Sequence, residues 1–174
     1  MKIVTNPQFK VYFDMDGVLD DFDEGVRHML HMEPLPQGIK DNKYNKALFS
    51  GIASVPHFYC KLHPFYDTIF LLYDVEDMIG EDNVEILTGV PLPHKGCDYA
   101  ADKEKWVRQF VSSHIKVNCV FSKDKPQFVE GPQSILIDDY PKNITQWNET
   151  GGTGILFKNV RQTREELSKL NILR

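Results

Sequence analysis

Short apolar segments recur along the chain, and most of them run into a polar residue followed by a turn or loop. They cover residues 9–14, 84–89, 117–122, 134–139 and 153–158. Each is rich in β-branched, aromatic or leucine side chains, which is typical of buried β-strands. Helix-like stretches separate the later segments, at residues 98–115, 141–149 and 159–170. This alternation predicts a parallel sheet covered by helices on both faces, and therefore an α/β fold.

The interval between the first two strand segments, residues 15–83, is far longer than one crossover connection requires. Within it lie helix-like stretches at residues 21–32, 43–52 and 63–80. We therefore expect a helical cap inserted after the first strand. The predicted division is a catalytic core of residues 1–21 and 76–174 with a cap of residues 22–75. Most aromatic residues of the insertion are expected to pack inside the cap itself.

The charge, the cysteines and the lengths of the apolar runs exclude several classes of protein. The formal net charge of -5 argues against binding to polymeric nucleic acid, which requires a basic surface. The three cysteines, Cys60, Cys97 and Cys119, form no C-x-x-C pair. No stretch approaches the roughly 18 apolar residues of a membrane span, and the N-terminal residues lack the apolar run of a secretory signal. We expect a soluble, cytoplasmic protein without a membrane partner.

Two carboxylates directly follow the first strand segment, at Asp14 and Asp16, and Gly17 then allows a tight turn. Two neighbouring acids can divide the work of phosphoryl transfer. One, kept ionised by a metal, attacks phosphorus, while the other protonates the leaving oxygen and later activates water. The alternative is a calcium loop, but Asp14, Asp16 and Asp23 do not match its alternating ligand register.

Polar residues also lie at the carboxyl ends of two further strand segments. Thr88 lies at the end of the segment at residues 84–89, and the pair Asp138 and Asp139 ends the segment at residues 134–139. The carboxyl ends of parallel strands meet at one edge of a sheet, where ligands bind in open α/β folds. Two acids at the end of an apolar strand are costly unless a cation or hydrogen bonds compensate them. An all-oxygen site of this kind suits Mg²⁺.

The segment F-D-M-D-G-V-L-D-D-F resembles the first motif of the haloacid dehalogenase superfamily. Within that superfamily it is similar to the 5'(3')-deoxyribonucleotidase family, the cytosolic type C 5'-nucleotidase-like group, whose members open with D-M-D-G-V-L-x-D-F. The resemblance runs through ordered motifs from about Phe9 to Trp147. It implies a three-layer α/β/α Rossmann-like core with a small helical cap. It also implies Mg²⁺-dependent hydrolysis of (deoxy)nucleoside monophosphates through an aspartyl-phosphate intermediate.

The resemblance implies roles for the acidic residues and for the threonine. Asp14 is the expected nucleophile, and Asp16 is the expected general acid and base whose main-chain carbonyl also meets the metal. Asp139 is expected to ligate Mg²⁺ directly, with Asp138 as a further ligand or as the partner of one. Thr88 matches the second motif, and its hydroxyl and the N–H groups from Gly89 onward would hold phosphate oxygens.

Two lysines and one aromatic residue complete the implied site. Lys125, in F-S-K-D-K-P-Q-F, is the best match to the motif lysine ahead of the last acidic strand, and Lys123 is its rival. Lys103, in D-K-E-K-W-V, would make a second phosphate contact. Phe22, eight residues after the nucleophile, is a candidate to pack against a base or sugar.

The chain departs from the family pattern at two positions, and both concern the pocket more than the chemistry. Gly89 follows the motif threonine where alanine or serine is expected, and Tyr140 follows the acidic pair where arginine is common. Alternative functions are therefore a phosphatase of sugar phosphates or another small phosphometabolite, a phosphotransferase, and a non-catalytic phosphate-binding regulator. The retained acidic residues argue against the last. A homodimer is compatible with the sequence, which fixes neither the base nor the sugar.

Overall fold

The computed structural model describes residues 8–36 and 38–174 and contains a five-stranded parallel sheet with strand order β3-β2-β1-β4-β5. The strands are β1 (Lys10–Phe13), β2 (Val84–Gly89), β3 (Lys116–Val120), β4 (Ser134–Asp138) and β5 (Thr153–Leu156). Each coincides with one of the apolar segments, within three residues at either end. The predicted α/β fold class is therefore confirmed.

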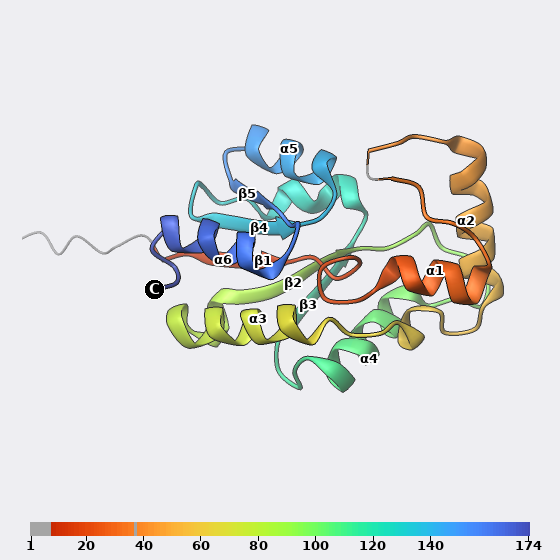
Figure 1. The fold of residues 1–174 in the computed structure, drawn as a ribbon, viewed down its shortest axis with the longest axis horizontal. Helices are drawn as coiled ribbons and strands as arrows, with labels where there is room; N and C mark the ends of the chain where they lie inside the picture. The colour runs from red at the N-terminus through yellow and green to blue at the C-terminus, as the bar shows by residue number, and fades with distance from the viewer. Residues whose placement is uncertain (1–7, 37) are drawn as a thin grey trace, which may run out of the picture.

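Helices cover both faces of this sheet and make a three-layer α/β/α arrangement (Figure 1). Side chains of a strand point alternately to its two faces, so Val11 and Phe13 pack on one side of β1 and Tyr12 on the other. The first face carries α3 (Tyr66–Ile79), α4 (Tyr99–Phe110) and α6 (Val160–Lys169). The second carries α5 (Pro141–Glu149) and the 3₁₀ segment η3 (Ser122–Phe128).

The central strand β1 pairs with β2 on one side and with β4 on the other, so Phe13 lies beside both Ile86 and Ile137. The order of the strands reverses beside β1, which makes this the topological switch point of the sheet. The backbone N–H of Asp14 continues the pairing by donating to the carbonyl of Ile137 at 2.9 Å. This pairing brings Asp14 next to the residues that follow β4.

A second hydrophobic cluster lies beyond the carboxyl ends of the strands, in α1 (Phe22–Leu30), α2 (Asn42–Ser54) and the 3₁₀ segment η1 (Tyr59–Lys61) (Figure 1). Phe58 and Tyr59 are buried in it, as expected for aromatics that form the core of a cap. These elements form a helical unit over the edge of the sheet that carries the acidic residues.

Helix α3 contains the predicted boundary between cap and core, which falls after residue 75. Its apolar residues Ile69, Leu72 and Val75 are buried in the cluster that also contains the sheet. Packing thus groups α3 with the sheet, as the crossover helix that leads into β2. The division into core and cap otherwise stays a prediction, and residues 1–7 of the predicted core lie outside the described residues.

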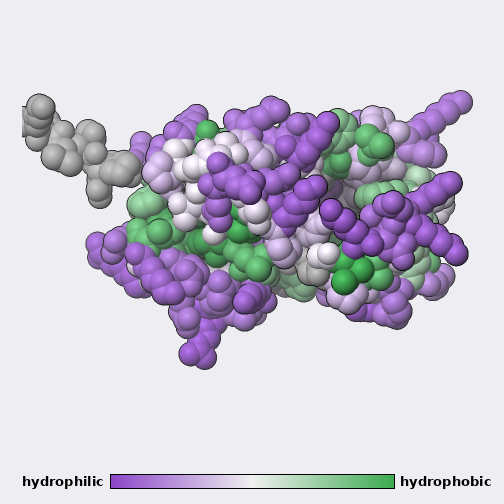
Figure 2. All heavy atoms as spheres, turned by 90° about the horizontal axis from the view of Figure 1, so that it is seen from above, coloured by the Kyte–Doolittle hydropathy of each residue, from purple (hydrophilic) through white to green (hydrophobic). Residues whose placement is uncertain are grey.

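The surface seen in Figure 2 is mostly hydrophilic, with apolar areas between the polar side chains. Over residues 8–36 and 38–174, no helix has both the length and the apolar character needed to cross a membrane.

Candidate active site

Asp14 lies directly after β1 at the switch point of the sheet, and it is only 6% exposed. The Nζ atom of Lys125, on η3, lies 2.9 Å from its Oδ1 atom and 2.7 Å from Oδ2 of Asp138. Burial by itself would lower the pKa of Lys125. The carboxylates of Asp14 and Asp138 outweigh this effect and raise that pKa above its ordinary value, so the lysine is charged. One buried cation thus bridges the ends of β1 and β4.

Asp138 is held entirely by protein donors. Its Oδ1 atom accepts the backbone N–H of Tyr140 at 2.8 Å, and its Oδ2 atom accepts from Lys125 and from the side-chain amide of Asn143 at 2.9 Å. Burial and then the charge of Asp14 raise the pKa of Asp138 to about 6, although Lys125 acts in the opposite direction. Its neighbours fix this carboxyl in place, which suits a residue that supports a metal ligand.

Asp139 is half-buried and lies against the turn after Asp14. A Cβ atom on Gly17 would lie 2.2 Å from Oδ2 of Asp139, and Gly17 has a φ of +74°. The close approach of this carboxylate therefore requires glycine at position 17. Oxygens of Asp14, Asp138 and Asp139 all lie within 4.8 Å of one another, and such a convergence of hard oxygen donors fits Mg²⁺.

Asp16 forms an ion pair with a different lysine, Lys103. The Nζ atom of fully buried Lys103, on α4, donates to Oδ2 of Asp16 at 2.7 Å and to Oγ1 of Thr88 at 2.9 Å. The same Nζ atom lies 4.4 Å from the centre of the Tyr59 ring, a cation–π contact. Burial raises the pKa of Asp16, and the charge of Asp14 adds to this effect, although Lys103 opposes it.

The structure thus brings the sequence-predicted residues into one site through two lysines. Lys125 connects Asp14 with Asp138, and Lys103 connects Asp16 with Thr88. The rival lysine, Lys123, is exposed and stands outside this network. The roles of these residues in catalysis and binding stay predictions.

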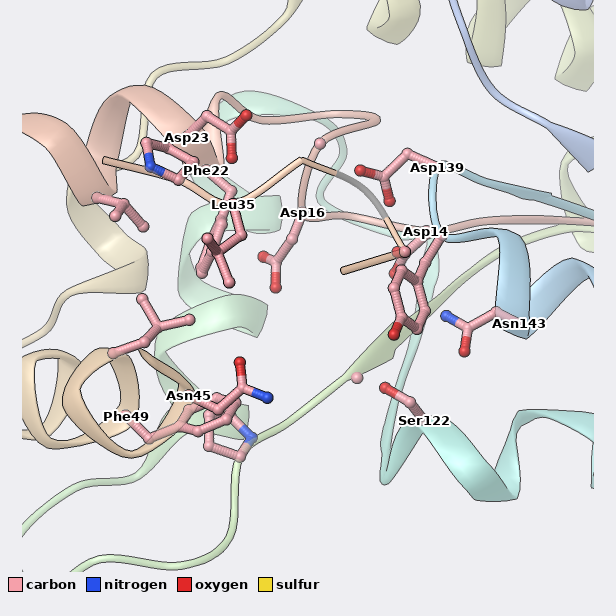
Figure 3. A pocket seen from close by; sticks show the side chains of 18 of the residues that line it. Asp14, Asp16, Phe22, Asp23, Leu35, Asn45, Phe49, Ser122, Asp139 and Asn143 are labelled. Atoms are coloured by element: carbon pink, nitrogen blue, oxygen red, sulfur yellow. The ribbon is translucent and has the colours of Figure 1, made fainter. Parts of the chain in front are cut away.

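A cavity of about 520 Å³ opens over this site. Its core wall includes Asp14, Asp16, Ser122, Asp139 and Asn143, and the facing wall comes from the 22–49 segment (Figure 3). Figure 3 shows Phe22, Leu35, Asn45 and Phe49 on that facing wall.

Phe22 also stacks on Tyr59, with ring centroids 6.5 Å apart. Phe22 and Gly89, two of the predicted substrate contacts, both line the cavity.

Sequence reasoning missed three residues of the site. Ser122 follows β3, and a Cβ atom on Gly89 would lie 2.4 Å from its Oγ atom. The rule that polar residues gather at the carboxyl ends of strands could have found it. Asn143 lies in the first turn of α5, and only its contact with Asp138 reveals it. Asp20 is fully buried, and its carboxyl oxygens have no hydrogen-bond partner among the described residues.

No family model matches the chain, and no curated protein matches it. Among solved structures, it is similar to a hydrolase from Pseudomonas syringae, with a TM-score of 0.50 and 14% identity over 90% of this chain and 89% of that chain. A hydrolase from Streptococcus pneumoniae TIGR4 aligns with a TM-score of 0.43 and 14% identity over 92% of this chain and 99% of that chain. At this identity the similarity to the Pseudomonas hydrolase supports the fold alone.

Proposed function

We propose that the protein is a magnesium-dependent phosphatase that hydrolyses phosphate monoesters with Asp14 as its nucleophile. The observation that carries this proposal is the separation of the first two acids onto different lysines. Asp14 pairs with Lys125 at 2.9 Å, and Asp16 pairs with Lys103 at 2.7 Å. Two carboxyls two residues apart thus have different environments, which is how one becomes a nucleophile and the other an acid.

The proposed metal ligands are Asp14, Asp139 and the main-chain carbonyl of Asp16. Asp138 supports them through Lys125, which contacts both Asp138 and Asp14. Bound Mg²⁺ would neutralise negative charge on the phosphoryl oxygens and on the carboxylates around it. Around Lys125 lie the carboxyl groups of Asp14, Asp138 and Asp139, so this part of the site has a surplus of negative charge that a divalent cation would balance.

The phosphoryl group would be held by the charged end of Lys125, the hydroxyl groups of Thr88 and Ser122, and the backbone N–H of Gly89. In the first step, an oxygen of Asp14 forms a bond to phosphorus as the bond from phosphorus to the leaving oxygen breaks. Asp16 gives its proton to that oxygen, which departs as an alcohol. Hydrogen-bond donors at fixed positions stabilise the charge that develops on the phosphoryl oxygens.

In the second step, water attacks phosphorus of the aspartyl-phosphate and the bond to Asp14 breaks. Asp16 takes the proton of the water, so both acids return to their starting states and phosphate is released. Burial raises the pKa of Asp16, which supports its protonated form before the first step. Its side chain is 27% exposed, so it remains accessible to a leaving group and to water.

We further propose a (deoxy)nucleoside monophosphate as the substrate. A volume of about 520 Å³ exceeds what phosphate alone needs and lies within the roughly 300–1,000 Å³ range of small-molecule sites. The wall from the 22–49 segment is rich in apolar and aromatic side chains such as Phe22 and Phe49, which can stack on a base. The amide of Asn45 is available on the same wall for a hydrogen bond to a base edge.

The test is phosphate release from deoxyribonucleoside and ribonucleoside monophosphates and from sugar phosphates, with Mg²⁺ or with EDTA. We expect magnesium-dependent release from nucleotides. Release from sugar phosphates alone would support the proposed phosphatase mechanism but contradict the proposed nucleotide substrate. Transfer of labelled phosphate to an alcohol acceptor in preference to water would identify a phosphotransferase. No turnover of any monoester would favour a phosphate-binding regulator.

A further inference from the structure

A second group of potential metal ligands lies outside the cavity, where η1 meets α4. It consists of His57, Cys60 and Asp102. The Nδ1 atom of His57 lies 2.8 Å from Oδ1 of Asp102, and the Sγ atom of Cys60 lies 3.4 Å from the main-chain oxygen of Asp102. One donor atom from each residue lies within 4.8 Å of the other two. None of these residues takes part in the proposed phosphatase reaction.

The local backbone explains why His57 and Cys60 face the same way. Residues three apart eclipse one another on a 3₁₀ turn, and the N–H of Cys60 donates to the carbonyl of His57 at 3.1 Å. His57 itself has a φ of +53°, in the left-handed region that non-glycine residues rarely adopt. A conformation of this kind persists only where the surrounding structure holds it in place.

Buried residues anchor the backbone on both sides of the group. Phe58 and Tyr59, which stand between His57 and Cys60, are buried in the hydrophobic cluster of the cap. On the other side, fully buried Trp106 of α4 donates its indole N–H to the carbonyl of Leu62 at 2.8 Å, just after η1. The three potential ligands therefore stand on backbone that is already in place, as a preformed metal site requires.

We propose that His57, Cys60 and Asp102 form a second metal site, selective for Zn²⁺ or a similar borderline ion. One nitrogen, one sulfur and one oxygen donor match the ligands that Zn²⁺ takes, and the fourth tetrahedral position is left for water. Mg²⁺ prefers oxygen donors throughout, so this group and the acidic cluster around Asp14 would select different ions.

The charge and proton balance of binding is simple. Burial and the charge of Asp102 raise the pKa of the Cys60 thiol, so the metal-free protein carries S–H there. Binding forms the metal–sulfur bond and releases that proton to solvent. Coordination through Nδ1 of His57 moves the ring proton to Nε2, on a side chain that is 72% exposed. The thiolate and the carboxylate then balance the two charges of the ion.

The site would act as a clamp between the cap and the core. Two of the three ligands have a sequence neighbour in the catalytic site, because Tyr59 precedes Cys60 and Lys103 follows Asp102. The Nζ atom of Lys103 lies over the Tyr59 ring and bonds Asp16. A metal that ties His57 and Cys60 to Asp102 would therefore fix the two elements that position this lysine.

Cobalt(II) gives a direct test, because a thiolate ligand produces a near-ultraviolet sulfur-to-metal charge-transfer band that oxygen ligands do not produce. The protein is treated with EDTA, exchanged into buffer with excess Mg²⁺ and a non-thiol reductant, and titrated with Co²⁺. We expect the band to saturate at one equivalent in the wild type and in Cys119→Ser, which removes another partly buried thiol. We expect its loss in Cys60→Ser and a much weaker titration in His57→Gln.

Thermal unfolding provides an independent measurement on the same proteins. Added Zn²⁺ should raise the unfolding midpoint of the wild type and of Cys119→Ser, but not that of Cys60→Ser. A wild type without the band, or a band that survives Cys60→Ser, would overturn the proposal. A site filled only by a large excess of metal would overturn it as well. These readouts do not depend on phosphatase activity, so the proposed function and the zinc site can fail separately.

Discussion

The Nζ atom of Lys103 lies 2.7 Å from Oδ2 of Asp16, and the lysine side chain is completely buried. The fold therefore fixes Lys103 beside Asp16, and the same Nζ atom also donates to Oγ1 of Thr88 at 2.9 Å. Asp14, two residues earlier, pairs with Lys125 instead, at 2.9 Å. Two carboxyls that are close in sequence are thereby oriented by different cations.

Lys103→Gln tests this arrangement. The variant keeps a polar side chain but removes the charge that orients Asp16, so we expect kcat to fall by about 10²- to 10³-fold. The pH dependence of kcat should also change, because the pKa of Asp16 would rise further without the opposing lysine. Lys105→Gln, at an exposed position of the same helix, is the matched control. An unchanged pH profile in Lys103→Gln would count against the assignment of Asp16.

Gly17→Ala tests the close approach of Asp139 to the turn after Asp14. The added Cβ atom would lie 2.2 Å from Oδ2 of Asp139, so the carboxylate must move and the affinity for Mg²⁺ should fall. Gly38→Ala is the control, because Gly38 also has a positive φ, of +83°, but no atom of the described residues lies within 4 Å of the added Cβ. Both variants should lose roughly 1 kcal/mol or more of stability from backbone strain.

The magnesium dependence of turnover separates these two glycine variants. We expect the Mg²⁺ concentration for half-maximal activity to rise in Gly17→Ala and to stay at the wild-type value in Gly38→Ala. Equal effects in the two variants would mean that backbone strain, and not the position of Asp139, controls metal binding.

Phe22→Ala tests the substrate wall. We expect KM for nucleoside monophosphates to rise about tenfold or more through the loss of a stacking surface, with a smaller change in kcat. Inorganic phosphate, which does not reach this wall, should inhibit the variant and the wild type equally. Phe70→Ala, at an exposed position of α3, is the control. A wild-type KM for nucleotides in Phe22→Ala would show that the base does not bind against this wall of the cavity.

Glu85, in β2, gives a prediction of pH dependence outside the site. Burial would raise its pKa, but hydrogen bonds from Lys10 and Asn118 outweigh this effect and lower the pKa below its ordinary 4.5. A lowered pKa in the folded state stabilises the protein above pH 4.5, and that contribution is lost as the pH falls through the folded-state value.

Urea unfolding at a series of pH values tests this sign. We expect Glu85→Gln to be less stable than the wild type at neutral pH, by up to about 1 kcal/mol. The difference should shrink below pH 4.5, whereas Glu149→Gln, at an exposed helix end, should follow the wild type throughout. A difference that grows on acidification would contradict the assignment.

The sequence predicted the sheet well because β1, β2 and β4 bury both faces and so appear as short apolar runs, and the less buried edge strands β3 and β5 still carry apolar residues. It predicted α5 to the residue, as Pro141 starts the helix and turn residues follow Glu149. It included most of α3 in the predicted cap, because an apolar helix face does not reveal which surface it will cover. Only the packing of Leu72 and Val75, on α3, in the cluster that contains the strand residues shows that this surface is the sheet.

The candidate site was predicted only in part, for a related reason. Motif residues such as Asp14 and Asp139 follow strands and are visible from their local sequence. Ser122 also follows a strand and could have been found by the same rule, whereas Asn143 becomes visible only when its contact with Asp138 is known. The pairing of His57 with Asp102, 45 residues later, is likewise a product of tertiary packing.

The central claim is that Asp14 becomes phosphorylated, and acid-quench labelling tests it most directly. An aryl phosphate is suitable because its leaving group departs without a proton, so Asp16→Asn should still form the intermediate and hydrolyse it slowly. We predict phosphate covalently bound to the peptide that contains Asp14 in Asp16→Asn, and none in the double variant that also carries Asp14→Asn. Phenol release without any bound phosphate, or undiminished turnover by a folded Asp14→Asn protein, would contradict the account.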